Sequence, residues 1–244
     1  MNRRPSFGES NGSLQKRECL HFISCRNAFH VQPLIFVFDN MKKTHRWIAR
    51  GDAVWAGPPS ITSKTVLQKL YPQLREFFQD QLKIPNGGPE ILCAELLKIS
   101  TRFRDASCIP EPERDQIYGL LQDMSHAIEG DSDASHWLKK LSHAAIFPVR
   151  CPSGRLTLRD ADGDFYIPDK TERFTKIFAS DISILSIPRG SLLIDIQPIL
   201  ESTIFKRLRW LESEVTVKAD PQGECSLQGE ISDKFANISS FVER

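Results

Sequence analysis

The sequence predicts an α+β protein in which a helical array precedes a smaller mixed unit of β-hairpin and helix. From Ser60 to about Ala145, apolar residues recur at three- and four-residue steps, as amphipathic helices require. From Ile146 the chain changes to short β-rich runs separated by turn residues. We therefore expect a poorly ordered segment 1–45, a helical array 46–145 with a Trp-Ala-Gly-Pro-Pro loop, a mixed unit 146–218 and a polar tail 219–244.

The segment before the helices contains one expected strand and one stiff loop. Leu34–Phe38 is an apolar run entered through Pro33 and closed by Asp39-Asn40, which is typical of a short strand. The loop from Gly51 to Ser60 contains Gly57-Pro58-Pro59. Because proline has no N–H and fixes φ, these residues favour an extended backbone without regular structure.

Four helices are expected between Ser60 and Ala145. The second begins at Pro89 after Gly88, since proline at the first helical position sacrifices no hydrogen bond. The third begins near Pro112 and stops at Gly130, and the fourth, from Ser132 or Asp133, turns Trp137 and Leu141 inward. The first helix, which Pro72 would kink or split after Tyr71, would collect residues with helical spacing on one face: Leu67, Leu70, Leu74, Phe77, Phe78 and Leu82.

Short elements are expected after Ile146. Strands at 146–150, 155–159 and 164–167 are predicted, the last two joined as a hairpin by the turn Asp160–Gly163, because Asp-Gly accepts positive φ. Asp169 followed by Glu172 fits a capping box and predicts a helix through Phe178. Ile182–Ile187 is β-rich. For 191–200 a strand and a helix both remain open, because Leu192, Leu193, Ile196 and Leu200 suit a helix while Pro198 opposes it.

Composition excludes several classes of protein. The chain of 244 residues has 32 Lys and Arg against 31 Asp and Glu, so its net charge of +1 provides no electrostatic attraction for DNA or an acidic membrane. Its longest strongly apolar run, Leu34–Phe38, is far shorter than a membrane span. The six scattered cysteines do not fit a disulfide scaffold. We expect an intracellular protein, cytoplasmic or nuclear, without a membrane partner.

No catalytic, cofactor-binding or metal-binding residue is predicted. Neither of the glycine-rich phosphate-binding motifs occurs. Asp160, Asp162 and Asp164 are spaced like calcium ligands, but the glycine and glutamate that complete such a loop are missing. The cluster Cys19, His21, Cys25 and His30 has no standard zinc spacing. We therefore expect no cofactor.

An enzyme of unrecognised class, hydrolytic or accessory in a biosynthetic pathway, remains the alternative function. It would use His126, His136 or His143 together with Cys93 or a distant acid, because catalytic partners need not be adjacent in sequence. This hypothesis requires two of these side chains to meet in a cleft with perturbed pKa values.

Two basic segments lie beside tryptophans. Lys42-Lys43-x-x-Arg46 and Lys206-Arg207-x-Arg209 combine cationic and aromatic groups, a pairing that can bind single-stranded bases. Nucleic-acid binding would need these cations to share one face. With a net charge near zero, a solvated surface or contact with acidic groups is the favoured interpretation, and a nucleic-acid partner is not expected.

The candidate interaction surface surrounds the stiff loop. Trp47 and Trp55 flank it, and a tryptophan beside proline-rich backbone can serve as an interface anchor. Packing of these indoles into the core is the alternative and the favoured one. The residues of this candidate surface are Trp47, Trp55, Gly57, Pro58 and Pro59.

An ordered set of motifs resembles a region of large fungal sacsin-like proteins, which carry an N-terminal ATPase module of the histidine-kinase/gyrase type. The motifs, in order, are Asp52–Pro59, Tyr71-Pro72, Phe77-Phe78, Phe147–Arg150 and Asp164–Ile167. The match spans roughly Arg50 to Val217. The region lies downstream of the ATPase module, and Ala56 replaces an Asp of the family motif. The resemblance therefore implies a non-catalytic protein-interaction or scaffold segment related to chaperone-like proteins, with a protein partner and no carried-over catalytic residue.

Overall fold

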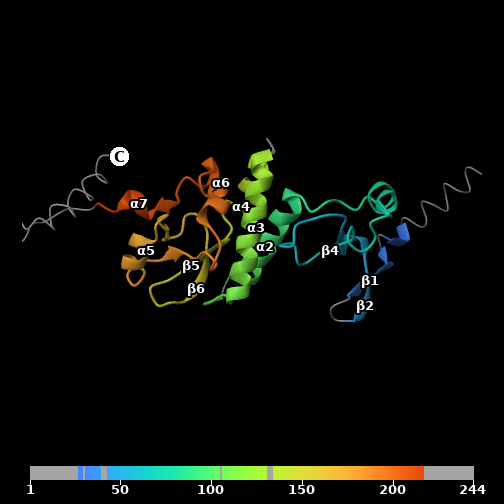
Figure 1. The fold of residues 1–244 in the computed structure, drawn as a ribbon, viewed down its shortest axis with the longest axis horizontal. Coiled ribbons are helices and arrows are strands. Elements are labelled where there is room, and N and C mark those ends of the chain that lie inside the picture. Colours follow the sequence, from blue (N-terminus) through green and yellow to red (C-terminus); the bar gives the residue numbers. More distant parts are fainter. Residues whose placement is uncertain (1–26, 30, 40–42, 105, 131–133, 217–244) are drawn as a thin grey trace, which may run out of the picture. The chain divides into compact units, whose positions relative to one another are not determined.

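The structure, a computed structural model, describes residues 27–29, 31–39, 43–104, 106–130 and 134–216 and confirms the α+β class (Figure 1). Residues up to Glu212 belong to one compact unit, and a second unit begins at Ser213. No described helix is both long enough and apolar enough to cross a membrane. The cluster Cys19, His21, Cys25 and His30 lies outside the described residues.

Three principal helices follow one another in the middle of the chain. They are α2 (Pro89–Arg102), α3 (Glu111–Gly130) and α4 (Ala134–Leu141), and α2 lies against both of the others (Figure 1). The expected start of α2 is confirmed: Gly88 is its N-cap, and Pro89 occupies the first turn. Shorter helical elements are a π-helix at Glu76–Gln81, 3₁₀ helices at Arg50–Asp52, Leu193–Ile196 and Thr203–Phe205, and α5 (Arg173–Phe178), α6 (Gln197–Leu200) and α7 (Leu211–Glu214).

The helix expected from Leu67 to Leu82 does not form as one element, and only the part after Pro72 is helical, as the π-helix Glu76–Gln81. The chain there makes a two-residue strand, β4 (Thr65–Val66), parallel to β3 (Ala53–Val54), and then turns before the π-helix. Leu67 N–H donates to the carbonyl of Val54 at 2.9 Å, so this N–H bonds to a distant segment, and only separate turns follow it. Leu70 and Leu74 are exposed, whereas Leu67, Phe78 and Leu82 are buried. The helical spacing therefore misled the prediction, because irregular backbone buries only some of these residues.

Five strands form a sheet in the order β6-β5-β8-β7-β9. Its strands are β5 (Phe147–Arg150), β6 (Leu156–Arg159), β7 (Tyr166–Ile167), β8 (Ile184–Leu185) and β9 (Arg209–Trp210). The hairpin is formed by β5 and β6, and β7 pairs in parallel with β8 and β9.

The predicted pairing of the strands around Asp160–Gly163 is therefore wrong. The turn itself forms, with Gly163 N–H donating to Asp160 O at 3.1 Å. The strands before and after this turn do not pair with each other, because Ala161 in the turn and Phe165 after it are buried in the core. Tyr166 N–H then donates to Ser183 O at 2.9 Å, so β7 pairs with β8 instead of β6. The turn was therefore predicted correctly, but Gly163 does not adopt the positive φ on which that prediction was based, and the predicted strand partner was wrong.

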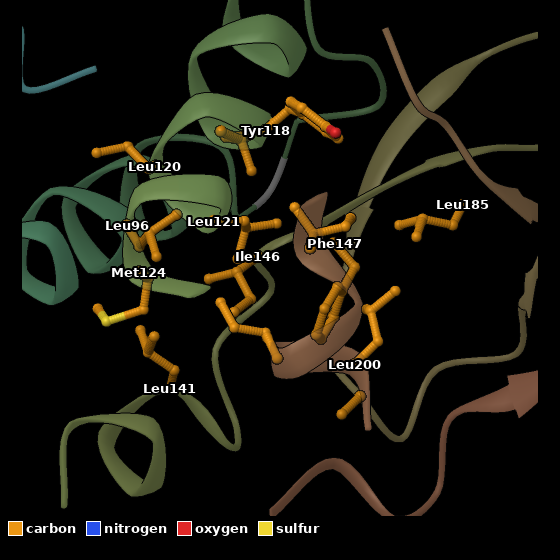
Figure 2. Close-up of a cluster of buried hydrophobic side chains, with 14 of the residues drawn as sticks. Leu96, Tyr118, Leu120, Leu121, Met124, Leu141, Ile146, Phe147, Leu185 and Leu200 are labelled. Atoms are coloured by element: carbon orange, nitrogen blue, oxygen red, sulfur yellow. The ribbon is translucent and has the colours of Figure 1, made fainter. Parts of the chain in front are cut away.

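Helices and sheet share one hydrophobic core (Figure 2). Helix α2 contributes Leu92, Leu96 and Ile99, residues at i, i+4 and i+7 that line one face. Helix α3 contributes Leu120, Leu121 and Met124, and the sheet contributes Phe147, Val149 and Leu185. A second cluster lies nearer the N-terminus and consists of Ile35, Val37, Ile48, Ala53, Trp55, Leu67, Phe78, Leu82 and Ile84.

Candidate functional site

A two-stranded hairpin near the N-terminus separates apolar side chains onto two faces. Its strands are β1 (Ile35–Asp39), which confirms the expected strand, and β2 (Thr44–Ile48), which was not predicted. The antiparallel register pairs Ile35 with Ile48 and Phe36 with Trp47. Because side chains alternate along a strand, Ile35, Val37 and Ile48 face the second hydrophobic cluster. The opposite face is left to the aromatic residues.

That opposite face, here called the aromatic face, consists of Phe36, Phe38, His45 and Trp47. The three large hydrophobic members are 39%, 42% and 57% exposed, in the order Phe36, Phe38 and Trp47. Phe36 pairs across the strands with Trp47, and Phe38 pairs with His45. The Phe36 ring stacks on His45 at a centroid distance of 5.9 Å and meets the Trp47 indole edge-on at 5.2 Å. The rings therefore form one continuous surface.

The hairpin is fixed by contacts to the segment that follows it. The Tyr71 hydroxyl donates to the carbonyl of Phe36, and Arg46 Nη2 donates to Thr65 Oγ1 at 3.1 Å. Below the hairpin the buried Trp55 stacks on Phe78 with a centroid distance of 6.1 Å. A tethered hairpin presents its rings in one arrangement, which lowers the entropy lost on binding.

The residues of the predicted interaction surface are divided by the fold. Trp47 lies on the aromatic face, whereas Trp55 is 4% exposed and belongs to the second cluster. Pro59 is exposed, and Gly57 and Pro58 are half-buried. Prediction missed Phe36, Phe38 and His45, although the alternation in Thr44-His-Arg-Trp-Ile48 could have identified a second strand facing β1.

Gly57 and Gly87 meet where two backbone segments approach each other closely, and the approach is tightest for a side chain at Gly87. Trp55 N–H donates to Pro85 O at 2.8 Å, and Gly87 N–H donates to Ala56 O at 2.6 Å. A Cβ on Gly87 would lie 3.0 Å from the Gly57 Cα. Glycine at this crossing therefore serves packing, since neither backbone could approach so closely with a larger residue.

The hairpin sequence is cationic, but Arg46 pairs with Val37 and therefore lies on the face away from the aromatic rings. Lys43 and Arg46 are exposed on the hairpin, and the sequence between Ile35 and Arg50 has a surplus of positive charge. The charged residues there are Lys42, Lys43, Arg46 and Arg50 against Asp39. Lys43 is the exposed cation described at the turn end of the hairpin, and apolar rings next to a cation are complementary to an apolar segment that carries an acid.

The histidines named for an enzyme are not brought together. His126, His136 and His143 are all exposed, and within the described part of the chain no hydrogen bond joins any two of them or joins one to Cys93. The Cys93 thiol lies 3.7 Å from the carbonyl oxygen of Trp137, and burial raises its pKa despite the nearby charge of Lys140. A raised pKa keeps this sulfur as a thiol, the less nucleophilic form.

The acidic loop and the C-terminal basic segment neutralise each other. Arg207 lies 3.1 Å from Asp162, Arg209 pairs with Asp164, and the Arg209 guanidinium also lies over the Tyr166 ring at 4.5 Å. Two acids of the loop and two arginines of the basic segment are thus paired with each other. Among the described residues, no three His, Cys, Asp or Glu side chains are grouped so that they could hold a metal ion.

Comparisons with known proteins give one similarity. Residues 90–209 match the sequence model of a family described as a domain of unknown function (DUF8348). The matched range begins in α2 and ends in β9, so it contains the helices and the five-stranded sheet but leaves out the aromatic face. No curated protein and no solved structure matches the chain.

Proposed function

We propose that this protein is a non-catalytic protein-interaction module and that the aromatic face is its contact surface. The observation that supports the proposal is the exposure of Phe36, Phe38 and Trp47 together on one tethered hairpin. Aromatic side chains are the residues that most often dominate protein interfaces. Among the described residues, no hydrogen bond joins the histidines of the alternative enzyme hypothesis to one another or to Cys93.

The favoured partner is a protein segment with apolar side chains that also carries an acidic one. Lys43, at the turn end of the hairpin, would meet such an acid, while the rings cover the apolar side chains. A nucleic acid is less well matched because the rings already contact one another: Phe36 stacks on His45 and meets Trp47 edge-on. Base stacking requires open ring faces.

From the resemblance to large fungal sacsin-like proteins, we also propose the kind of assembly in which this module acts. Its partner would be a component of a chaperone-like or scaffold assembly, and the interaction would occur inside the cell. Cys93, Cys108 and Cys151 are free thiols, in keeping with a reducing compartment.

Affinity purification with paired variants tests the contact surface. F36S/W47S removes two rings of the aromatic face, and I177S/L74S removes two exposed apolar side chains elsewhere. We expect the wild type and I177S/L74S to retain the same protein partner and F36S/W47S to lose at least nine-tenths of it. The loss of one aromatic cross-strand pair amounts to about 0.5–1.5 kcal/mol, so F36S/W47S still folds, which thermal unfolding verifies.

Equal recovery of every co-purifying protein by the wild type and F36S/W47S would reject the aromatic face as the contact surface. Recovery of RNA instead of protein, with binding that weakens steeply as salt is raised, would replace the protein-interaction proposal by nucleic-acid binding.

A further inference from the structure

A cavity of about 520 Å³ opens beside the five-stranded sheet, away from the hairpin residues. One side is formed by Pro168–Lys170 and the start of α5, and the other by the chain from Ile184 to Leu193. This volume falls within the range of pockets that hold small organic molecules, about 300–1,000 Å³. The cavity lies within the range that matches the domain of unknown function.

Apolar side chains line most of the cavity. Pro168, Ile184, Leu185 and Pro188 are buried and contribute to its walls together with Ile187 and Leu193. Such walls favour a ligand with a hydrocarbon body, because binding removes apolar surface of both partners from water.

Some polar groups of the cavity already have a hydrogen-bond or ion-pair partner within the protein, and others do not. The Asp169 carboxylate accepts hydrogen bonds from Thr171 Oγ1 at 2.7 Å and from the N–H groups of Arg173 and Thr175 at 2.8 Å. Glu172 pairs with Lys176 at 3.4 Å, and Arg150 pairs with Glu111 at 2.9 Å. These three charges are therefore compensated by the protein itself.

Two cations and one hydroxyl group remain for a ligand. Lys170 and Arg189 are exposed and line the cavity, and neither has an ion pair to any residue in the described part of the chain. Ser186 is 9% exposed, and its hydroxyl donates to no other residue that the structure describes. The charge of the cavity mouth is thus positive, and its interior offers one hydrogen-bond donor.

The wall from Ser191 to Asp195 is held in place by α3. The hydroxyl of Tyr118 donates to the carbonyl of Leu192 at 2.5 Å and lies 3.1 Å from Asp195 Oδ2. Burial and the Asp195 carboxylate raise the pKa of Tyr118 to about 12, so the hydroxyl keeps its proton at neutral pH. A wall anchored in this way is largely formed before a ligand arrives.

From this arrangement we propose that the cavity binds a small organic carboxylate whose apolar body lies against the walls and whose carboxylate contacts Lys170 and Arg189. This inference is independent of the aromatic face. A carboxylate suits the site because both cations carry only donors and Ser186 adds another.

Calorimetric titration of the full chain with sodium octanoate tests the proposal, with 1-octanol as the uncharged analogue. We expect one saturable site for octanoate and binding at least tenfold weaker for 1-octanol. K170Q/R189Q should weaken octanoate binding at least tenfold, since it removes both charge-assisted contacts to the carboxylate. K69Q/R155Q removes the same charge from exposed positions elsewhere and should bind octanoate like the wild type.

Two results of the titration would be incompatible with a carboxylate site in the cavity. Absence of saturable octanoate binding at millimolar concentration would overturn the proposal, as would equal affinity for octanoate in K170Q/R189Q and the wild type. S186A is the second variant, and its thermal unfolding should match the wild type while its affinity for octanoate falls severalfold. An unchanged affinity in S186A would remove the hydroxyl from the site.

Discussion

Asp169 shows how one side chain determines the geometry around a short helix. Its carboxylate bonds to the N–H groups of Arg173 and Thr175, which lie in the first turn of α5. The expected capping box is wrong, because α5 begins at Arg173 with Glu172 as its N-cap, at a left-handed φ of 54°, although the Asp169 carboxylate still accepts hydrogen bonds from the first turn. Burial favours the protonated acid, yet hydrogen bonds from Thr175 and Thr171 outweigh it and hold the pKa of Asp169 well below its usual range.

The depressed pKa gives a pH-dependent prediction for D169N. A carboxylate that titrates lower in the folded protein stabilises it above the unfolded pKa of about 4, and this contribution disappears as the pH falls further. We expect D169N to lower the free energy of unfolding by about 2 kcal/mol at pH 7. Urea unfolding between pH 7 and pH 3 should show the two proteins converging below pH 4, while D80N follows the wild type throughout. A difference in free energy of unfolding between the wild type and D169N that stays constant from pH 7 to pH 3 would contradict a role for the Asp169 charge.

Glu95 gives the opposite case on helix α2. It is 5% exposed and accepts a hydrogen bond from the Ser63 hydroxyl. Burial raises its pKa, although Lys98 and Lys64 act against the shift. A carboxyl that titrates higher in the folded protein makes folding less favourable above that pKa, and this cost vanishes below the unfolded pKa of about 4.3.

E95Q should therefore be more stable than the wild type at pH 8 and indistinguishable from it at pH 4. The glutamine carbonyl can still accept the Ser63 hydrogen bond, so only the charge is removed. Thermal unfolding at the two pH values measures this, with E90Q on an exposed position of the same helix as the control. A lower melting temperature for E95Q at pH 8 would mean that attraction to the two lysines exceeds the cost of burial.

At the scale of elements, one segment connects the hairpin region to the helices. Ile61 is buried in the core formed by helices and sheet, although it precedes α2 in the chain. Gln116 Nε2 donates to Thr62 Oγ1 at 2.6 Å, and the Ser60 hydroxyl donates to Asp123, so α3 holds the segment after Pro59. The proline-rich loop therefore ends in a segment that is hydrogen-bonded to α3. The restricted backbone of the loop limits how far the two hydrophobic clusters can move apart.

G87A tests the backbone crossing beneath this loop. A Cβ there would lie 2.6 Å from Ile61 Cδ1 and 3.0 Å from Gly57 Cα, so either the anchor or the crossing must shift. We expect a loss of about 1–3 kcal/mol in the free energy of unfolding, as for other overpacked sites. G51A is the matched control because nothing lies within 4 Å of a Cβ at that position. Equal stability of G87A and the wild type in urea would show that the crossing is not tight.

At the scale of the whole molecule, local signals in the sequence were more informative than long-range ones. The start of α2 was predictable because Gly88 and Pro89 act on their own neighbours. The strand partners of β7 were not, since pairing with β8 depends on where Phe165 becomes buried. The same limit applies to the candidate site: Trp47 was named from the sequence, but its exposure beside Phe36 follows from the unpredicted strand β2.

The claim that the aromatic face contacts a protein partner is tested most directly by photo-cross-linking in cells. A benzophenone amino acid replaces Trp47 and reacts with whatever lies against position 47. Position 181, where Asp181 is exposed, is the control. The account predicts one discrete protein adduct from position 47 that survives nuclease treatment, is lost when Phe36 is also changed to Ser, and does not form from position 181. Equal adducts from both positions, or an adduct from position 47 that nuclease removes, would contradict it.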